Sequence, residues 1–171
     1  KLPLNSLSLD QQKKYDLGID SAQHKPNSAY VNYPSYTKFT FIRNPWSRFV
    51  SEYEYFKKFN RLDISFSEFV NQVSYLPDMN GALNISGKKT LRYHFVEQYK
   101  FIEGSSIDYI GQFENLHEDF NIIKTKLNIQ GELPFLNKSP NEVHYTQYYN
   151  DVTKEKVRQL YNMDILKYQY K

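Results

Sequence analysis

The feature that most constrains this chain is a change of pattern at residues 38–58, which read KFTFIRNPWSRFVSEYEYFKK. Residues Lys38–Ile42 alternate β-branched and aromatic side chains, which predicts a short buried strand. Pro45 suits the first turn of a helix, and apolar residues then recur every three or four positions, which predicts a helix over Trp46–Lys58 with one buried face. The backbone must therefore turn from a strand into a helix at Arg43–Pro45, which we call the Arg43 corner.

The patterns after the corner are typical of parallel α/β layering. They predict a helix with a Ser65 and Glu68 capping box, a strand at Ile107–Gly111, a helix capped by Asn115 with a stripe of Leu116, Phe120, Ile123 and Leu127, and helices at Val152–Tyr161 and Asp164–Tyr168. Between them, Asp78–Thr90 carries Gly81 and Gly87 and is predicted to be a long loop, either a lid or a substrate edge. We expect one helix-rich α/β domain over residues 1–171, with a small parallel sheet.

Composition excludes several classes of function. The chain has 171 residues, a net charge of +3 and no cysteine. Disulfides, thiolate catalysis and cysteine-based zinc sites are therefore excluded, and the four histidines show no metal-ligand spacing, so we expect no metal. Lys and Arg do not cluster on one predicted face, which argues against a nucleic-acid partner, and no run is long enough to span a membrane. A mild positive charge suits one local site for a small anion.

The Arg43 corner has the chemistry of such an anion site. A helix that begins just after a buried strand presents unpaired N–H groups and the positive end of its dipole. The Arg43 guanidinium suits two phosphate oxygens, and Ser47 and Ser51 lie four positions apart on one helical face. The alternative is that Arg43 and Arg48 pair with carboxylates such as Glu52, and that Ser47 is an ordinary polar residue of the first turn. The residues alone leave both interpretations open.

A family resemblance bears on this choice. The segments FTFIRNPWSRFVSEYEY, HFVEQYKFI, IDYIGQFENLHEDFNIIKTKLNI and HYTQYYNDVTKEKVRQLYNMDILKYQY resemble, in this order, segments of the carbohydrate sulfotransferase superfamily, in its family-2-like branch. Members of this superfamily use 3′-phosphoadenosine 5′-phosphosulfate (PAPS) as donor. The resemblance implies a three-layer fold like that of P-loop NTPases, a PAPS donor and a carbohydrate hydroxyl as acceptor.

The resemblance also assigns roles at the corner. It implies that Arg43 and Ser51 contact the 3′-phosphate of the nucleotide, where the geometry also places Ser47. Arg48 is expected to be structural, anchoring its helix to the segment Gln112–Glu114. Trp46 and Tyr53 are candidates either to line the adenine or to belong to the core. Aromatic residues of the 78–99 and 145–149 segments are candidates to stack on sugar rings, with core packing as the alternative.

One part of the family pattern is missing from the sequence. Relatives carry a first strand followed by a loop of the type P-K-[TS]-G-[TG]-[TS], which holds the 5′-phosphosulfate, and no such loop occurs here. Lys1, Lys13 and Lys14 lack the glycine-rich context that a phosphate-binding loop needs. We expect the loop to lie upstream of Lys1; otherwise the protein lacks half of the donor site.

Sulfuryl transfer to a hydroxyl needs a general base. The resemblance places His24 where relatives that act on glycans carry a catalytic histidine, and His94 is the second candidate. Gln98 is expected to orient local structure, His117 to be exposed and inert, and His144 has no assigned role.

The function predicted from the sequence is a PAPS-dependent sulfotransferase that acts on a carbohydrate hydroxyl. The alternative is a catalytically silent domain that binds nucleotide or glycan. The lack of cysteine and of an anchor favours a bacterial cytoplasmic protein without a membrane partner, with the Golgi lumen open if an upstream anchor was removed. The sequence does not indicate the acceptor or the oligomeric state.

Overall fold

A computed structural model of the chain describes residues 35–59, 63–73, 82–91, 94–104, 106–134 and 143–171. The predictions for His24 and for the segment before residue 35 lie outside these residues. Among the described residues no helix is long and apolar enough to cross a lipid bilayer.

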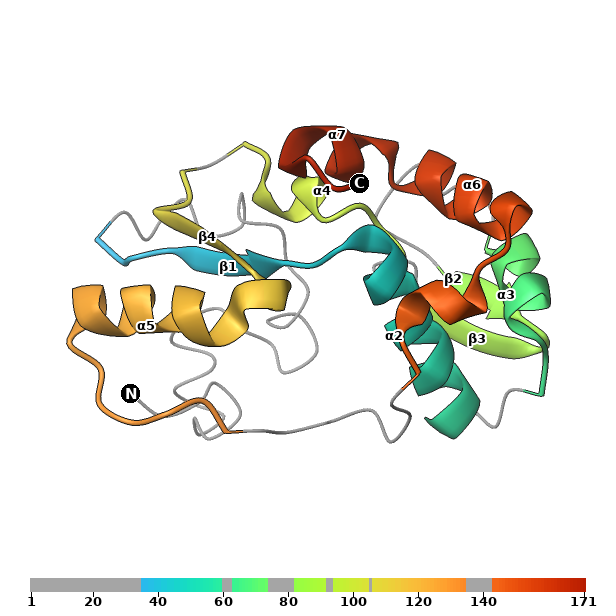
Figure 1. Cartoon of the computed structure of the whole chain (residues 1–171), viewed down its shortest axis with the longest axis horizontal. Coiled ribbons are helices and arrows are strands. Elements are labelled where there is room, and N and C mark those ends of the chain that lie inside the picture. The colour runs from blue at the N-terminus through green and yellow to red at the C-terminus, as the bar shows by residue number, and fades with distance from the viewer. Residues whose placement is uncertain (1–34, 60–62, 74–81, 92–93, 105, 135–142) are drawn as a thin grey trace.

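A two-stranded parallel sheet forms one end of the molecule. Strand β1 (Phe39–Ile42) pairs in parallel with β4 (Tyr109–Gln112), in a register that runs from Phe39 opposite Tyr109 to Ile42 opposite Gln112. A parallel pair needs a crossover connection. Here it contains α2 (Pro45–Phe59), α3 (Phe66–Gln72), the hairpin of β2 (Ala82–Ile85) and β3 (Lys88–Leu91), and α4 (Tyr99–Ile102). Helix α5 (Leu116–Leu127) runs along one side of the two strands (Figure 1). Both predicted strands are confirmed in position, as is a helix-rich α/β fold with a small parallel sheet. The predicted burial of the first strand is wrong for most of β1, because Phe39 is exposed and only Ile42 is buried.

Helix α2 (Pro45–Phe59) begins immediately after the corner because its first turn is well capped. The Asn44 side-chain oxygen accepts hydrogen bonds from the backbone N–H groups of Trp46 and Ser47, at 3.0 and 3.1 Å. Pro45 occupies the first helical position, where its lack of an N–H group has no cost. The predicted helix and the place of Pro45 are confirmed, whereas the cap formed by Asn44 was not predicted.

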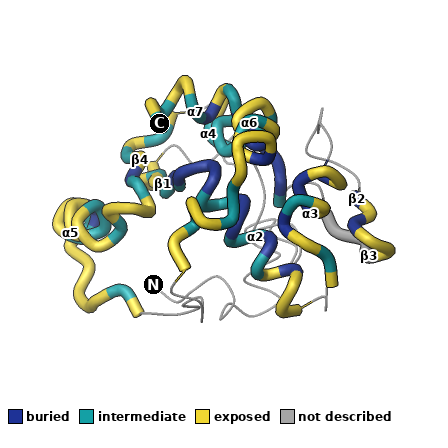
Figure 2. Tube along the Cα trace, turned by 45° about the vertical axis from the view of Figure 1, so that its right-hand side comes forward, coloured by how far each residue is buried: buried dark blue, intermediate teal, exposed yellow. Residues whose placement is uncertain are grey.

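The core lies where the buried face of α2 meets α3 (Phe66–Gln72), α6 (Asp151–Leu160) and the hairpin. Figure 2 shows the buried segments gathered around α2, while α5 is mostly exposed. The predicted capping box at Ser65 and Glu68 is present and starts α3. More than half of the core side chains are aromatic, and several of their rings pack edge to face. The core residues are Trp46, Phe49, Val50, Tyr53, Phe56, Phe66, Phe69, Val70, Val73, Leu83, Ile85, Phe95, Val157 and Tyr161.

The predicted loop at Asp78–Thr90 is wrong where the structure describes it. Residues 82–91 form an antiparallel hairpin of β2 (Ala82–Ile85) and β3 (Lys88–Leu91). Its two-residue turn has positive φ at both Ser86 and Gly87, 48° and 80°, which matches the twist of a hairpin. Leu83 and Ile85 alternate into the core, so the hairpin is a layer of the domain and not an open lid.

The C-terminal half adds short helices around this frame. They are α4 (Tyr99–Ile102), the 3₁₀ turns η4 (Phe113–Asn115) and η5 (Tyr145–Tyr148), and α7 (Asn162–Tyr168) after α6. The helices predicted at 152–161 and 164–168 are confirmed. The predicted Asn115 cap is wrong, because its side chain makes no capping bond and the η4 turn leads into α5 instead. The α5 stripe is only partly buried: Ile123 is buried, and Leu116, Phe120 and Leu127 are half-buried.

Candidate anion site at the Arg43 corner

The Arg43 corner lies where both parallel strands end. Strands β1 and β4 pair with each other, Arg43 directly follows the last residue of β1, and Phe113 directly follows the last residue of β4. The N-terminus of α2 begins at the same place and contributes its positive dipole end. In open α/β sheets, ligands bind at this carboxyl edge of parallel strands.

The Arg43 guanidinium is held by Ser47 at its Nε edge and by the Phe113 ring against one face. Its Nε donates a hydrogen bond to the Ser47 hydroxyl at 3.0 Å, and its guanidinium carbon lies 4.5 Å from the centre of the Phe113 ring. Within the described part of the chain, neither terminal nitrogen of Arg43 has a hydrogen bond or an ion pair. Burial lowers the pKa of Arg43, even though nearby Glu114 and Glu52 act to raise it. The guanidinium is thus partly desolvated without a direct carboxylate partner, which favours binding of an anion.

The two serines lie on the same side of α2 as this guanidinium. Ser47 and Ser51 are both half-buried, and Ser47 already accepts the Nε bond of Arg43. The Ser51 hydroxyl has no hydrogen-bond partner among the residues that the structure describes. An anion held by the terminal nitrogens of Arg43 therefore finds a further hydroxyl donor one helical turn after Ser47.

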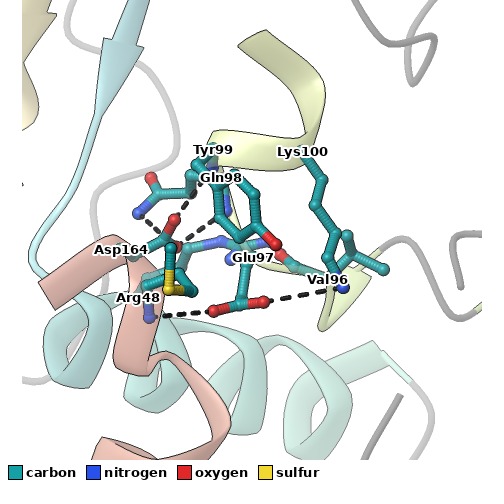
Figure 3. A network of polar contacts seen from close by, with 8 residues as sticks. Arg48, Val96, Glu97, Gln98, Tyr99, Lys100 and Asp164 are labelled. Atoms are coloured by element: carbon teal, nitrogen blue, oxygen red, sulfur yellow. Dashed lines mark hydrogen bonds and ion pairs between the residues drawn. The ribbon is translucent and has the colours of Figure 1, made fainter. Parts of the chain in front are cut away.

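The backbone of Arg43 is held by a side chain from a distant segment. Gln98 accepts the Arg43 N–H and donates to the Arg43 carbonyl, both at 2.8 Å. Asp164 on α7 accepts the backbone N–H groups of Gln98 and Tyr99, at 2.7 and 2.8 Å (Figure 3). Burial raises the pKa of Asp164, although these hydrogen bonds and Arg48 act to lower it. The orienting role predicted for Gln98 is confirmed.

The next peptide unit is held in the same way. Glu114 accepts the Asn44 N–H at 2.7 Å with one carboxylate oxygen, and the Tyr170 hydroxyl donates to the other at 3.3 Å. Glu114 follows β4, and Tyr170 follows α7. The corner is thus tied to the end of β4 and to the segment after α7.

Arg48 has the structural role that the sequence predicted, but with a different partner. It donates to the backbone carbonyls of Val96 and His94, at 2.8 and 3.0 Å, and its guanidinium lies over the Tyr161 ring at 5.5 Å. The predicted anchor to Gln112–Glu114 is wrong. Arg48 lies on the side of α2 that faces the chain before α4, and the 112–114 segment reaches the corner through Glu114 and Asn44 instead.

His94 is the catalytic candidate that the structure describes. Its Nδ1 lies 3.3 Å from a carboxylate oxygen of Glu52, and its ring stacks on Tyr55 with centroids 6.4 Å apart. Since the His94 carbonyl is held by Arg48, this residue is fixed at both its backbone and its side chain. His117 is exposed, as predicted, and the Nδ1 of His144 lies 2.8 Å from the Thr146 hydroxyl.

Four of the aromatic residues with two predicted roles lie in the core or pack against it. Trp46 and Tyr53 are 5% and 4% exposed, and both are core residues of α2. Each polar end is satisfied internally, because the Trp46 ring N–H donates to the Lys154 carbonyl and the Tyr53 hydroxyl donates to the Ile64 carbonyl. Tyr148 and Tyr149 likewise pack edge to face on Phe66, so this part of the 145–149 segment lines the core.

Sequence reasoning missed the residues that support the corner from a distance. Asp164 and Glu114 look like ordinary helix and turn carboxylates, and nothing in their spacing shows that they accept backbone N–H groups elsewhere. Asn44 could have been found, because an asparagine before a proline and an apolar stripe is a good N-cap signal. In the described ranges, no group of three or more metal-ligating side chains is placed to hold a metal ion.

Fold and site together define a helix-rich α/β protein with a candidate anion site at a strand-to-helix turn. The model of the sulfotransferase family matches residues 7–171, and the chain therefore belongs to the sulfotransferase family. An uncharacterized protein of Archaeoglobus fulgidus is 35% identical over 102 residues, which cover 59% of this chain and 75% of the relative. No solved structure matches the chain.

Proposed function

We propose that this member of the sulfotransferase family uses PAPS as donor and transfers its sulfuryl group to a hydroxyl of a carbohydrate. The proposal includes a P-loop-NTPase-like arrangement of one domain, in which the corner holds the 3′-phosphate end of the nucleotide. The observation that carries it is the environment of Arg43. Its terminal nitrogens have no hydrogen-bond partner within the described residues. They lie next to the N-terminus of α2 and to the Ser51 hydroxyl, which also has no partner among the described residues.

A phosphate monoester fits these groups. It carries close to two negative charges at neutral pH and three acceptor oxygens. Arg43 would donate two parallel hydrogen bonds, Ser51 a third, and Ser47 would hold the Nε edge of the guanidinium in place. A free 3′-phosphate is what separates PAPS from ordinary adenine nucleotides, so the same contacts would select the donor.

The other end of the donor needs a second site. The 5′-phosphosulfate end would need a loop of the family pattern, which does not occur in residues 1–171, and the corner would supply only the 3′-phosphate half of the donor site. When the donor is bound, transfer forms a bond from the acceptor oxygen to sulfur and breaks the bond from sulfur to the bridging phosphate oxygen, and the acceptor proton goes to a base. Adenosine 3′,5′-bisphosphate is the other product.

His94 and His24 are the candidates for that base. Glu52 beside Nδ1 of His94 favours the tautomer with a proton on Nδ1, which directs Nε2 to accept the acceptor proton. The stacked Tyr55 ring limits rotation of the imidazole. His24 lies outside the described residues and is a candidate through the family pattern alone.

An exposed aromatic surface supports a carbohydrate as the acceptor. Tyr55 and Phe59 are 48% and 60% exposed, with ring centroids 4.7 Å apart, and Tyr55 stacks on His94. Ser47, Ser51, Tyr55 and Phe59 follow one another every four residues along α2, so one row of the helix leads from the corner to these rings. Aromatic faces of this kind suit the C–H faces of a sugar ring, and the neighbouring His94 would then lie close to a bound hydroxyl.

The first test of the proposal is nucleotide preference. Adenosine 3′,5′-bisphosphate should raise the melting temperature more than 5′-AMP does, because only the bisphosphate reaches Arg43. Arg43→Ala should weaken bisphosphate binding by about 2 to 3 kcal/mol, the value of a charge-assisted bidentate contact. Arg43→Lys should recover only part of this loss, since lysine offers a point charge. Equal shifts with both nucleotides in the wild-type protein would refute the 3′-phosphate site.

The second test separates the enzyme from a silent binding domain. The natural protein, with any residues that precede Lys1, is assayed for sulfuryl transfer from PAPS to a panel of oligosaccharides. Removing the base should lower turnover by about 10²- to 10⁴-fold with bisphosphate affinity unchanged. His94→Ala and His24→Ala therefore identify which histidine acts. Selective bisphosphate binding without transfer to any acceptor would favour the silent domain.

A further inference from the structure

We infer that Gln98 and Asp164 are positioning residues for the nucleotide: by fixing the backbone of Arg43 they direct its guanidinium and set the preference for a 3′-phosphate. The inference rests on the proposed 3′-phosphate site. Neither residue is expected to touch the ligand, and both lie far from Arg43 in sequence.

The first step is the hold that Gln98 has on Arg43. The sheet ends at Ile42, which pairs with Gln112, so the peptide groups of Arg43 lie beyond the strand ladder. The Gln98 side-chain amide pairs with Arg43 as a neighbouring strand would. It accepts from the Arg43 N–H and donates to the Arg43 carbonyl, at 2.8 Å each. Because both polar groups of one residue are engaged, the backbone of Arg43 is fixed in direction.

The second step is the hold that Asp164 has on Gln98. A helix as short as α4 has little stability of its own, so its position depends on what binds its first N–H groups. The Asp164 side chain is fully buried and accepts hydrogen bonds from the backbone N–H groups of Gln98 and Tyr99. The side-chain amide nitrogen of Gln98 donates to the same carboxylate at 3.4 Å. Glu97 connects the same segment to α7 a second time by accepting the Met163 N–H at 3.1 Å.

The third step connects this frame to the ligand. The Arg43 guanidinium is guided only by the Ser47 hydroxyl and the Phe113 ring among the described residues. Its terminal nitrogens must therefore be aimed by the backbone from which the side chain extends. A binding group must be held within about 0.5 Å of the productive geometry. A change that loosens the Arg43 backbone should therefore misalign the two terminal nitrogens of its guanidinium even when the protein stays folded.

The test compares two nucleotides in matched variants of the full chain. Dissociation constants for adenosine 3′,5′-bisphosphate and for 5′-AMP are measured by titration calorimetry, well below each melting temperature, for Gln98→Met and Asp164→Asn. The preference for the bisphosphate should fall about 10-fold, while 5′-AMP binding stays within about twofold, because only the aim of Arg43 changes. Tyr168→Phe is the matched control on α7, because its buried hydroxyl has no partner among the described residues and its removal should leave the preference as in wild type.

Each outcome decides the inference. Folded Gln98→Met and Asp164→Asn proteins with the wild-type preference, or with equal losses for both nucleotides, would overturn it and leave the two residues merely structural. If Asp164→Asn does not fold, Gln98→Met decides, since Gln98 is only half-buried and methionine has a similar volume. Arg43→Ala measured alongside separates the two proposals: a preserved preference there would refute the 3′-phosphate site itself.

Discussion

Changing Arg48 to methionine should lower the melting temperature and leave the proposed preference for a 3′-phosphate intact. Arg43 and Arg48 are five residues apart in one motif, yet their side chains serve different purposes. Arg48 donates to the carbonyls of His94 and Val96 and covers the Tyr161 ring. Methionine keeps the apolar stem but leaves both carbonyl oxygens without their donor.

The size of the effect follows from these contacts. Hydrogen bonds from a charged donor contribute about 1.5 kcal/mol each, and the cation over the Tyr161 ring about 0.5 kcal/mol. The loss is therefore about 3.5 kcal/mol, which lowers the melting temperature of a domain of this size by about 7 to 14 °C. Arg158→Met is the matched control: within the described part of the chain its guanidinium makes only an exposed bidentate ion pair with Glu155, at 2.6 and 2.7 Å. Surface pairs contribute little, so this variant should melt within about 2 °C of wild type.

Thermal unfolding followed by circular dichroism measures the first effect, and titration with adenosine 3′,5′-bisphosphate and 5′-AMP measures the second. An Arg48→Met protein that melts like wild type would show that the two carbonyl bonds contribute nothing. A folded Arg48→Met protein that has lost its nucleotide preference would place Arg48 in the phosphate site, and the division of roles between the two arginines would be wrong.

Two further predictions concern packing and pH. In Gly111→Ala the new methyl carbon would lie 2.6 Å from the Phe41 ring and 3.1 Å from the Asp119 side chain. This overpacking should lower the free energy of unfolding in urea by about 1 to 3 kcal/mol. A urea midpoint equal to that of wild type would show that the neighbouring side chains and α5 move aside easily. Burial raises the pKa of Asp164 above the unfolded value of about 3.9, so the stability it contributes is greatest below that value and falls as the pH rises through the folded pKa. The destabilisation by Asp164→Asn should therefore be larger at about pH 4 than at about pH 7, and the opposite trend would mean that the hydrogen bonds to Asp164 outweigh its burial.

Local patterns predicted the elements that depend on neighbouring residues. The strand before Arg43, the helix after Pro45 and the Ser65 capping box were readable because each involves groups within a few positions of one another. The β2–β3 hairpin is not predicted, because Gly81 and Gly87 in the sequence also indicate a loop. A Ser-Gly pair after the alternating residues Ala82–Ile85 is equally compatible with a two-residue hairpin turn.

Long-range partners could not be predicted in this way. Periodicity places Arg48 on one side of its helix but does not say which segment packs there, and the 94–96 carbonyls are 46 to 48 positions away. Asp164 shows the same limit, because a buried carboxylate and an exposed one have the same sequence pattern. The family resemblance identified the segments that contain Gln98, Glu114 and Asp164. The structure shows why these segments belong together: Gln98 and Glu114 bind the backbone of the corner, and Asp164 binds the backbone of Gln98.

The side chains that hold the corner have a consequence for how the protein is made. Gln98 lies 55 positions after Arg43, Glu114 lies 70 after Asn44, and Asp164 lies 66 after Gln98. Contacts between such distant segments form late, because the intervening chain must first be ordered. At about 5 to 20 residues per second, a ribosome needs roughly 6 to 24 s to pass from Arg43 to Asp164. During that interval a nascent chain already contains the arginine and the serines, yet we expect it to have no selective affinity for a 3′-phosphate until α7 has emerged and docked.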